Sequence, residues 1–424
     1  CTGWRRGGRF RGWGRMRNKA GIGGKAPKLR FPEFLEPWKY EILAPYLEGY
    51  SERVPANTDL PIYSSTRTGL TYQKEYYAGQ EMANEGEYGV VPKGYFVYRH
   101  MSDDGIFKFN INEIEEKLAV SKEYPVFRTV QLNSNFLLHK LNSGDDFKRF
   151  AMMQKKGGTR TRLYFNTLCS WKTLLPFPAE QRKIADCLSS IDALIAVQTQ
   201  KLEVLKAHKK GLMQHLFPAE GETVPKLRFP EFRDAGEWEK KKAGTLFKNR
   251  TEEGEAGLPI YSVTMNDGMI KRSLLDRRVD DISEPEGNKK ANKTDIVYNM
   301  MRMWQGAFGV VGEDCMVSPA YVILAPQNGV CSDFFGYLLK LPRYLRLLAS
   351  HSQGLTPDRL RLYYKDFAHI LLLSPSFPEQ QKIADCLSSL DNLITAQTQT
   401  LEALRTHKKG LMQQLFPSAD EARG

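Results

Sequence analysis

The feature that most constrains the fold is a long internal duplication. Residues 180–218 align with residues 379–417, and 29 of these 39 positions are identical. The octapeptide PKLRFPEF occurs unchanged at 27–34 and at 225–232, and LPIYS at 60–64 recurs 198 residues later. A period of about 199 residues is far longer than the unit of a solenoid. We therefore expect two similar domains related by a pseudo-two-fold axis.

Each copy of the duplicated segment predicts one long helix. Its apolar residues recur at alternating spacings of four and three, the heptad pattern of a coiled coil. Proline precedes both segments and ends both, at Pro178, Pro378, Pro218 and Pro417. Since one such helix is not stable alone, we expect the two to pair as an antiparallel coiled coil. The predicted core residues are Ile184, Leu188, Ile191, Ile195, Gln198, Leu202, Leu205, Ile383, Leu387, Leu390, Ile394, Gln397, Leu401 and Leu404.

The two glutamines in this pattern allow two interpretations. Gln198 and Gln397 occupy the same heptad layer in the two copies. A polar residue inside a coiled-coil core fixes the register at some cost in stability. Alternatively, both side chains lie at the edge of the seam, in water. The pattern does not favour either interpretation.

The regions outside the two helices predict mixed α+β domains. Short runs rich in aromatic and β-branched residues, bounded by Gly and Pro, indicate strands at LPIYS, GYFVYRHM, DIVYNMM and GAFGVVG. Residues 334–350 are helix-like, although Pro342 interrupts them. The predicted division is a basic leader at 1–26, a globular domain at 27–176, a helical region at 177–222, a second domain at 223–376 and a second helical region at 377–424.

The net charge of +12 does not by itself indicate a nucleic-acid partner. Residues 1–26 hold six Arg, two Lys and no acid, so this leader contributes +8, while the other 398 residues hold 53 basic and 49 acidic groups. The leader has no apolar periodicity. We expect it to be disordered and to be an extended upstream translation that takes no part in the fold. No apolar run approaches the roughly 20 residues that span a bilayer.

Motifs of catalysis and metal binding are missing from the sequence. None of the six cysteines lies in a CxxC, which predicts reduced thiols, no metal site and a cytoplasmic protein. Asp104, Glu115 and Lys117 loosely match the acidic pattern of metal-dependent nucleases, as Glu239 and Lys241 do. Such matches arise by chance in a chain with 26% charged residues. His208 and His407, near the expected helix ends, are interpreted as C-terminal capping residues.

The order of these motifs resembles one known family. Each copy carries PKLRFPEF, LPIYS, a Gly-rich turn (155–166 and 352–364) and an FPxEQxKIA-type junction that leads into the long helix. This order resembles the specificity subunit of type I restriction–modification systems over residues 27–417. The resemblance implies two target recognition domains separated by two helical regions that pair as an antiparallel coiled coil. Each domain would read one half of a split DNA target.

The resemblance also implies partners and cofactors. The helical regions would set the half-site spacing and dock two modification (methyltransferase) subunits, with restriction subunits joining afterwards. The chain itself would have no catalytic residue and no cofactor. S-adenosylmethionine and ATP with magnesium would bind on the partner subunits.

Candidate DNA contacts follow from residue type and context, because arginine suits guanine and glutamine suits adenine. The candidates are Arg67, Lys74, Arg99, Arg160 and Arg162 in the first domain, and Lys271, Arg272, Arg302, Gln305, Arg359 and Arg361 in the second. Arg162 and Arg361 recur in both copies, so we expect them to hold the frame or a phosphate. Trp304 is expected in the core. Two alternatives stay open: a nuclease that uses Asp104, Glu115 and Lys117, and a coiled-coil adaptor whose domains bind protein.

Overall fold

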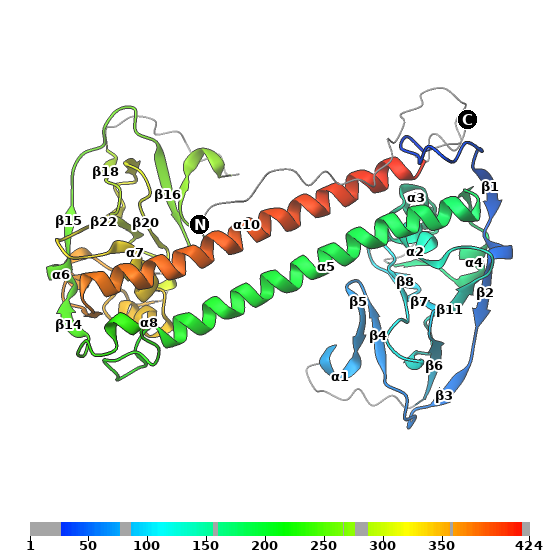
Figure 1. Ribbon diagram of the computed structural model, residues 1–424, viewed down its shortest axis with the longest axis horizontal. Coiled ribbons are helices and arrows are strands. Elements are labelled where there is room, and N and C mark those ends of the chain that lie inside the picture. The colour runs from blue at the N-terminus through cyan, green and yellow to red at the C-terminus, as the bar shows by residue number, and fades with distance from the viewer. Residues whose placement is uncertain are drawn as a thin grey trace. The chain divides into compact units, whose positions relative to one another are not determined.

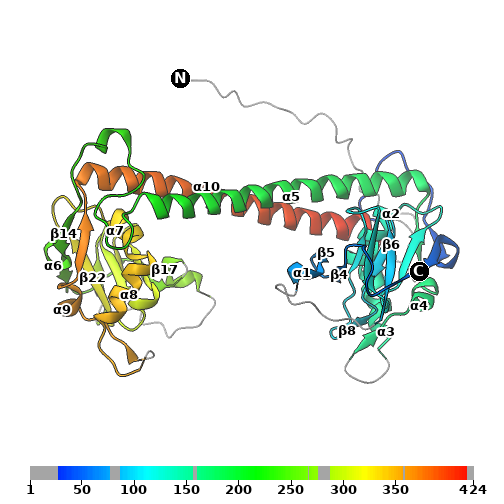
Figure 2. The same cartoon turned by 90° about the horizontal axis from the view of Figure 1, so that it is seen from below.

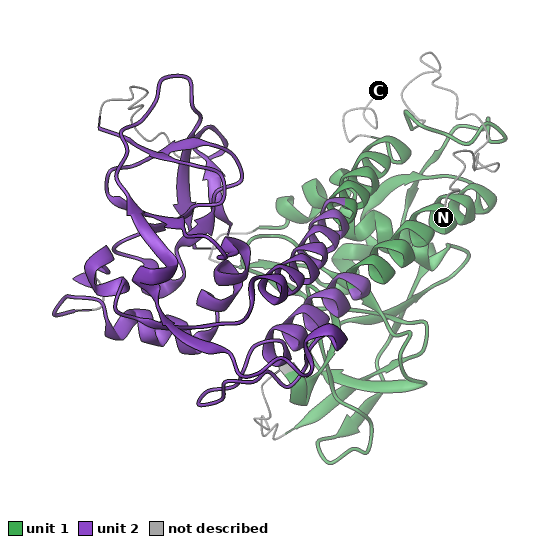
Figure 3. Cartoon of the chain, turned by 60° about the vertical axis from the view of Figure 1, so that its left-hand side comes forward, with its two compact units in different colours: residues 1–199, 400–424 green, residues 200–399 purple. Residues whose placement is uncertain are grey.

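The chain divides into two compact units (Figure 3). Unit 1 comprises residues 1–199 with 400–424, and unit 2 comprises residues 200–399. The computed structural model describes residues 27–76, 86–155, 160–265, 267–275, 287–356 and 359–417. The basic leader, the centre of the first Gly-rich turn and part of the second lie outside the described residues.

Two long helices contribute to both units, as the change of colour along each helix in Figure 3 shows. Helix α5 is Pro178–His215 and helix α10 is Phe377–Leu415. Proline lies in the first turn of both helices, where its missing N–H costs no hydrogen bond. The residues predicted for the helix core are all buried or half-buried, whereas Leu194 and Leu393 on the same helices are exposed.

Within each unit the start of one long helix packs beside the end of the other. In unit 1, Leu188 of α5 and Leu415 of α10 belong to one buried cluster, and Asp192 pairs with Lys408. In unit 2, Leu387 of α10 lies in one cluster with the residues that follow α5, and Lys209 Nζ lies 2.5 Å from Asp391 Oδ1. The helices therefore run antiparallel where they meet.

Unit 1 carries short antiparallel strands in small sheets (Figure 2). The central sheet has the order β2–β11–β7–β9, with bounds Leu47–Tyr50, Val126–Thr129, Phe96–Tyr98 and Phe109–Ile111. A second sheet has the order β10–β6–β3, with bounds Lys117–Ser121, Glu87–Pro92 and Arg53–Pro55. Three strand pairs are β1 (Lys39–Ile42) with β13 (Lys172–Leu175), β4 (Tyr63–Thr66) with β5 (Gly69–Tyr72), and β8 (Met101–Ser102) with β12 (Thr161–Arg162).

Unit 2 repeats the central sheet of unit 1 with the same connectivity. Its order is β15–β22–β19–β20, with bounds Phe247–Arg250, Tyr321–Pro326, Ile296–Asn299 and Phe308–Val310. A second sheet has the order β17–β16–β21–β18, with bounds Gly268–Lys271, Ile260–Thr264, Cys315–Val317 and Lys289–Ala291. Strands β14 (Glu239–Lys242) and β23 (Leu371–Ser374) form a pair equivalent to β1 and β13. The expected strands at DIVYNMM and GAFGVVG are β19 and β20.

Short helices complete both units, so the expected α+β class is confirmed. Those of unit 1 are η1 (Ala44–Tyr46), α1 (Gln73–Tyr76), α2 (Ser134–Ser143), α3 (Asp145–Met153) and α4 (Phe165–Cys169). Those of unit 2 are η2 (Pro230–Phe232), α6 (Ala243–Leu246), η3 (Arg272–Leu274), η4 (Met303–Gln305), α7 (Ser332–Leu339), α8 (Pro342–Ser350) and α9 (Tyr364–Phe367). The helical segment 334–350 is divided at Pro342, as expected, because proline occupies the first turn of α8.

Helices α2 and α7 lie against the long helices, each within its own unit (Figures 1 and 2). An aromatic cluster is buried beside each. Trp38 lies edge-on to Phe136 and Phe416 in unit 1, and Trp238 lies edge-on to Phe217 and Phe334 in unit 2. Each cluster ties the first residues of a globular unit to the end of a long helix. No helix within the described residues is long and apolar enough to cross a membrane.

Candidate nucleic-acid interface

Two buried ion pairs fix the globular parts to the long helices. In unit 1, Arg30 of the first PKLRFPEF donates from Nε and Nη2 to Glu180 at 2.8 and 2.7 Å. In unit 2, Arg228 of the second copy makes the same fork with Glu379, at 2.7 Å for both bonds. Both glutamates lie in the first turn of a long helix, where a negative charge is favourable. The arginine of each repeated octapeptide therefore anchors a globular part to a long helix.

The glutamine that follows each glutamate ties the same junction. Gln181 Oε1 accepts a bond from the Asn133 N–H at 3.0 Å, and its Nε2 donates to the Pro176 carbonyl at 2.9 Å. Gln380 repeats both bonds, to the Cys331 N–H at 2.9 Å and to the carbonyl of the proline before α10 at 2.9 Å. The repeated Glu-Gln pair is therefore structural.

A buried tyrosine in each unit positions the strand that carries a candidate arginine. Tyr98 donates its hydroxyl to the Leu163 carbonyl at 3.1 Å, and Tyr298 donates to the Leu362 carbonyl at 3.2 Å. The preceding residues, Arg162 and Arg361, are exposed. Arg162 and Arg361 thus occupy equivalent exposed positions, and that they hold the frame or a phosphate stays a prediction.

Four of the five candidate residues of unit 1 gather around one cleft. The cleft has a volume of about 620 Å³, and both Arg67 and Arg99 line it. Arg160 Nε donates to Asp103, also in the lining, at 2.9 Å, and Arg162 pairs across β12 and β8 with Met101. The cleft lies between the β4–β5 hairpin and the loop 99–106.

The fifth candidate of unit 1 lies elsewhere, and a lysine and a histidine that the sequence did not single out line the cleft. Lys74 lies on α1 and is not among the described residues that line the cleft. Lys108 and His100 are lining residues. Burial lowers the pKa of Lys108, as does the charge of Lys408. His100 stacks on Tyr164, with ring centroids 5.6 Å apart. The residues around Lys108 and His100 show no periodic pattern from which either could have been predicted to line a cleft.

Asp104 is the most strongly held carboxylate of this cluster. Its Oδ1 accepts bonds from Ser102 Oγ at 2.7 Å and from the Ile106 N–H at 3.1 Å. Both carboxylate oxygens also accept from Arg67 Nη2, at 2.7 Å each. These bonds, that from Ser102 above all, lower the pKa of Asp104 to about 2. The carboxylate is therefore charged at neutral pH.

The nuclease-like trio is held by separate partners in the structure. Lys117 pairs with Glu52 at 3.0 Å, and Asp104 pairs with Arg67. Glu115 lines a shallow pocket beside Tyr63 and Tyr72. Among the described residues, no group of three or more His, Cys, Asp or Glu side chains is arranged to hold a metal ion.

In unit 2, four candidates lie on two adjoining loops. Arg302 and Gln305 are exposed on the turn around η4, while Arg359 and Arg361 are exposed on the loop that follows α8. The Leu362 N–H donates to the Met300 carbonyl at 2.9 Å, which brings the two loops side by side. Trp304 is half-buried and donates from Nε1 to the Met301 carbonyl.

The other two candidates of unit 2 follow the β16–β17 hairpin. Lys271, at the end of β17, pairs with Glu313 at 2.8 Å and lies over the ring of Tyr261. The hydrogen bond that Lys271 donates to Glu313 raises the pKa of Lys271. Arg272 begins η3, and its Nε is buried. The tip of this hairpin carries the exposed Met265 at the position of Arg67 in unit 1.

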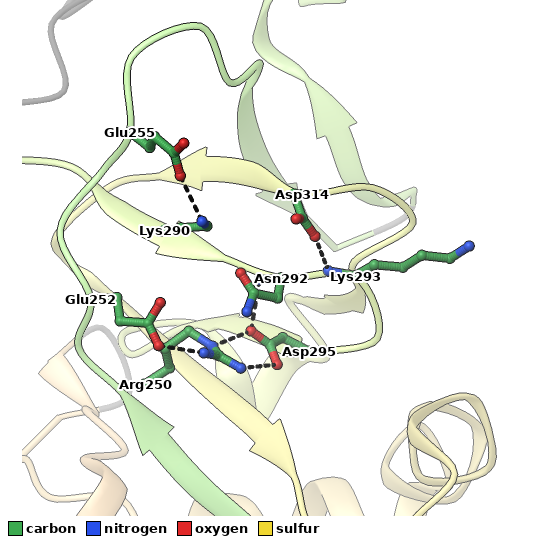
Figure 4. A network of polar contacts seen from close by, with 8 residues as sticks. All are labelled: Arg250, Glu252, Glu255, Lys290, Asn292, Lys293, Asp295 and Asp314. Atoms are coloured by element: carbon green, nitrogen blue, oxygen red, sulfur yellow. Dashed lines mark hydrogen bonds and ion pairs between the residues drawn. The ribbon is translucent and has the colours of Figure 1, made fainter.

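The two units build equivalent positions with different chemistry, as Figure 4 shows for unit 2. At the end of β15, Arg250 donates to the buried Asp295, with Nε 2.7 Å from Oδ2. Burial raises the pKa of Asp295 despite this bond. At the end of β2 in unit 1, Tyr50 and Tyr95 occupy the same places and meet edge-on at 5.1 Å. The same two strand positions therefore hold a charged pair in unit 2 and an aromatic pair in unit 1.

Two further interpretations can be compared with the structure. His208 and His407 lie seven and eight residues before the ends of their helices and are exposed. Their interpretation as caps of the last turn was wrong, because each helix continues past its histidine almost to Pro218 or Pro417. Gln397 is buried, with 7% of its surface exposed, and Gln198 is half-buried. Neither glutamine is fully in water.

Comparisons with known proteins agree with this architecture. The sequence pattern of the family described as "Type I restriction modification DNA specificity domain" matches residues 52–207 and 231–406. The specificity subunit of the type I restriction enzyme HindI from Haemophilus influenzae is 23% identical over 197 residues, which are 44% of this chain and 42% of that protein. The chain thus spans less than half of that relative's length. The MjaVIII specificity subunit from Methanocaldococcus jannaschii is 24% identical over 332 residues, 74% of this chain and 73% of that protein.

A solved structure shares the fold. The S subunit of a type I restriction–modification system from M. genitalium has a TM-score of 0.59 and 13% identity, over 93% of this chain and 99% of that one. At that identity the likeness concerns the fold alone. It nevertheless extends over both units and both long helices.

Proposed function

Because this chain belongs to the family of type I restriction–modification DNA specificity subunits, we propose that it reads a split, asymmetric duplex target, with one unit on each half-site. As a member of that family it is a DNA-recognition component and not the catalytic one. The two long helices set the separation of the half-sites and dock two methyltransferase subunits. Restriction subunits join the complex, and S-adenosylmethionine and ATP with magnesium bind to the partners.

One observation carries the proposal of two different half-sites. The two units share the same sheets and anchoring contacts, which we call the frame, but they differ in the side chains of their loops. The junction ion pairs, the tyrosine anchors and the four-stranded sheets recur. The hairpin tip carries Arg67 in unit 1 and Met265 in unit 2. Side chains at base edges specify sequence, whereas the frame only fixes orientation. A common frame with different tips suits an asymmetric target.

The long helices also carry a feature that suits protein partners. Leu194 and Leu393 occupy equivalent positions of the two copies, and both side chains are exposed. Two equivalent apolar sites match the two methyltransferase subunits of the proposal, since exposed apolar residues commonly mark protein contacts. Changing Leu194 to Glu is expected to weaken the docking of one methyltransferase copy, and Leu393 to Glu the docking of the other. Sedimentation of the complex measures the loss.

The exchange of one unit's globular part tests the modular assignment. Residues 35–176 would be replaced by the same region of another family member, and the modified bases would be mapped in cells that also carry the methyltransferase. We expect one half of the target to change while the other half and the spacing remain. A change in both halves would refute the assignment of one unit to each half-site.

A heptad insertion in both long helices tests the role of the helices as a spacer. It should widen the gap between half-sites and leave both half-site sequences intact, because rigid helices fix the separation. An unaltered gap would refute that role. Footprinting of two separated half-sites by the complex with its methyltransferase would exclude a purely protein-binding adaptor. Metal-dependent cleavage by the purified chain, lost in Glu115→Ala, would instead support the nuclease.

A further inference from the structure

We propose that Asp104 is a positioning residue for base recognition: it holds the Arg67 guanidinium through Nη2 so that the edge formed by Nη1 and Nη2 faces a guanine in one half of the target. This inference rests on the proposed function, which supplies the duplex. It goes beyond that function by naming the base that unit 1 recognises and the two residues responsible. The pair joins the β4–β5 hairpin to the loop 99–106.

The carboxylate is fixed before any ligand arrives. Ser102 Oγ and the Ile106 N–H both bond to Asp104 Oδ1, so the side chain is held by its own loop. Arg67, by contrast, contacts Asp104 through Nη2 alone. Among the described residues, no other hydrogen bond is made by this guanidinium. Its side chain is 64% exposed, so its Nη1–Nη2 edge remains accessible at the cleft.

The hairpin tip that carries Arg67 is also rigid. Thr66 Oγ1 donates to the Gly69 carbonyl at 2.8 Å and accepts from the Thr68 N–H at 3.2 Å. The buried Asn110 donates from Nδ2 to Ser65 Oγ and to the Thr66 carbonyl, at 2.8 and 3.1 Å. Gly69 has a φ of +138°, a conformation that side-chain-bearing residues rarely adopt. A fixed backbone and a fixed carboxylate leave the guanidinium little freedom.

A guanine fits this arrangement better than a phosphate does. A planar fork of N–H donors matches the O6 and N7 acceptors of guanine in the major groove. The Asp104 charge would repel a phosphate close to Arg67, but it does not oppose an uncharged base edge. Arg160 differs, because its partner Asp103 is 74% exposed and makes one bond, at 2.9 Å. Asp103 can move aside, so Arg160 suits a phosphate.

Among the described residues, the hairpin tip of unit 2 has no such pair. Met265, exposed at the equivalent position, offers an apolar group instead. The guanine preference therefore belongs to one half-site only, and the other half-site serves as an internal control.

The test uses the complete chain in complex with its methyltransferase subunit and a pool of randomised duplex DNA. The wild-type complex should select a motif of two blocks with a guanine in the block read by unit 1. Asp104→Ala should lower the preference for that guanine about tenfold, since a bidentate contact supplies discrimination of this order. Arg67→Met, which copies unit 2, should lower it as much and leaves the bonds of Asp104 to its own loop. The second block should not change.

Asp103→Ala is the matched control, since it removes the neighbouring carboxylate and should leave both blocks intact. Should Asp104→Ala disturb the fold of unit 1, Asp104→Asn replaces it, because the amide oxygen still accepts from Ser102 Oγ and the Ile106 N–H while the charge that holds Arg67 is lost. A two-block motif whose guanine persists in Arg67→Met would overturn the inference and leave the proposed function standing. A wild-type complex that selects no split motif would refute the proposed function, and the inference with it.

Discussion

Removal of the junction arginines, Arg30 and Arg228, should reveal how firmly the globular parts are anchored. Each arginine makes a two-bond fork to a glutamate that is 1% exposed, and the arginines themselves are 13% and 9% exposed. Replacement of either one by alanine leaves a buried charge without its partner. Breaking a buried ion pair in this way costs about 3–5 kcal/mol.

The two glutamates differ in one contact, to a tryptophan, which sets the expected difference between the copies. Trp238 Nε1 donates to Glu379 Oε1 at 3.3 Å, whereas Trp38 Nε1 is buried without a hydrogen bond among the described residues. A hydrogen bond to a charged group contributes about 1.5 kcal/mol or more at good geometry, and this one is long. We therefore expect a cost of about 4 kcal/mol for Arg30→Ala and about 3 kcal/mol for Arg228→Ala.

Hydrogen exchange at increasing urea separates the two effects, because it follows the first turns of α5 and α10 individually. Each substitution should lower protection in its own unit, more so for Arg30→Ala. Adding Trp238→Phe to Arg228→Ala should remove the difference between the copies. A cost below about 1 kcal/mol in both copies would refute the reasoning, since pairs of that strength are typical of solvated surfaces.

Three further predictions concern pH, packing and salt. Burial, and then the charge of Lys408, lower the pKa of His139 to about 4. The unfolded chain, with a pKa near 6.5, binds the proton first, so stability is full above pH 6.5 and is lost as pH falls towards 4. Urea denaturation should show a loss of about 2 kcal/mol from pH 7 to 5, and His139→Tyr, the residue at the equivalent position Tyr337, should abolish it. Leu188→Ala, in a fully buried site, should cost about 2–5 kcal/mol by the same assay; a smaller loss would contradict its place in the helix core. Arg160→Ala should reduce the slope of log affinity against log salt by about 0.9 with base preference unchanged, as measured by DNA titrations at several salt concentrations.

The sequence predicted the elements that depend on local pattern. The heptads at Leu188 and Leu387, with the proline before each, placed both long helices to within a few residues. Pro342 correctly divided the helical segment of unit 2. The helix ends were predicted as well, because Pro218 and Pro417 lie two or three residues beyond the observed ends, and only the placing of His208 and His407 in the last turn was wrong.

The candidate interface was predictable only in part. Residue type pointed to Arg67 and Arg160, and the structure brings both to one cleft. Asp104 was noticed for the wrong chemistry, because a nuclease-like spacing says nothing about partners that lie far away in the sequence. Its partner Arg67 is 37 residues away, and only the fold brings the hairpin and the loop 99–106 together.

The sequence by itself determined that this chain is a duplicated protein with two helical regions and two regions of mixed helix and strand. Duplication, heptads and prolines are local patterns that directly constrain the backbone. Only the tertiary structure decided what the repeated residues do. Arg30 and Glu180 are 150 residues apart, and each appears in a motif whose identity between copies could as easily have marked a binding site. Burial and geometry show that they are anchors. The same packing sets Arg67 against Asp104 in unit 1, a contact between distant segments that neither segment shows by itself.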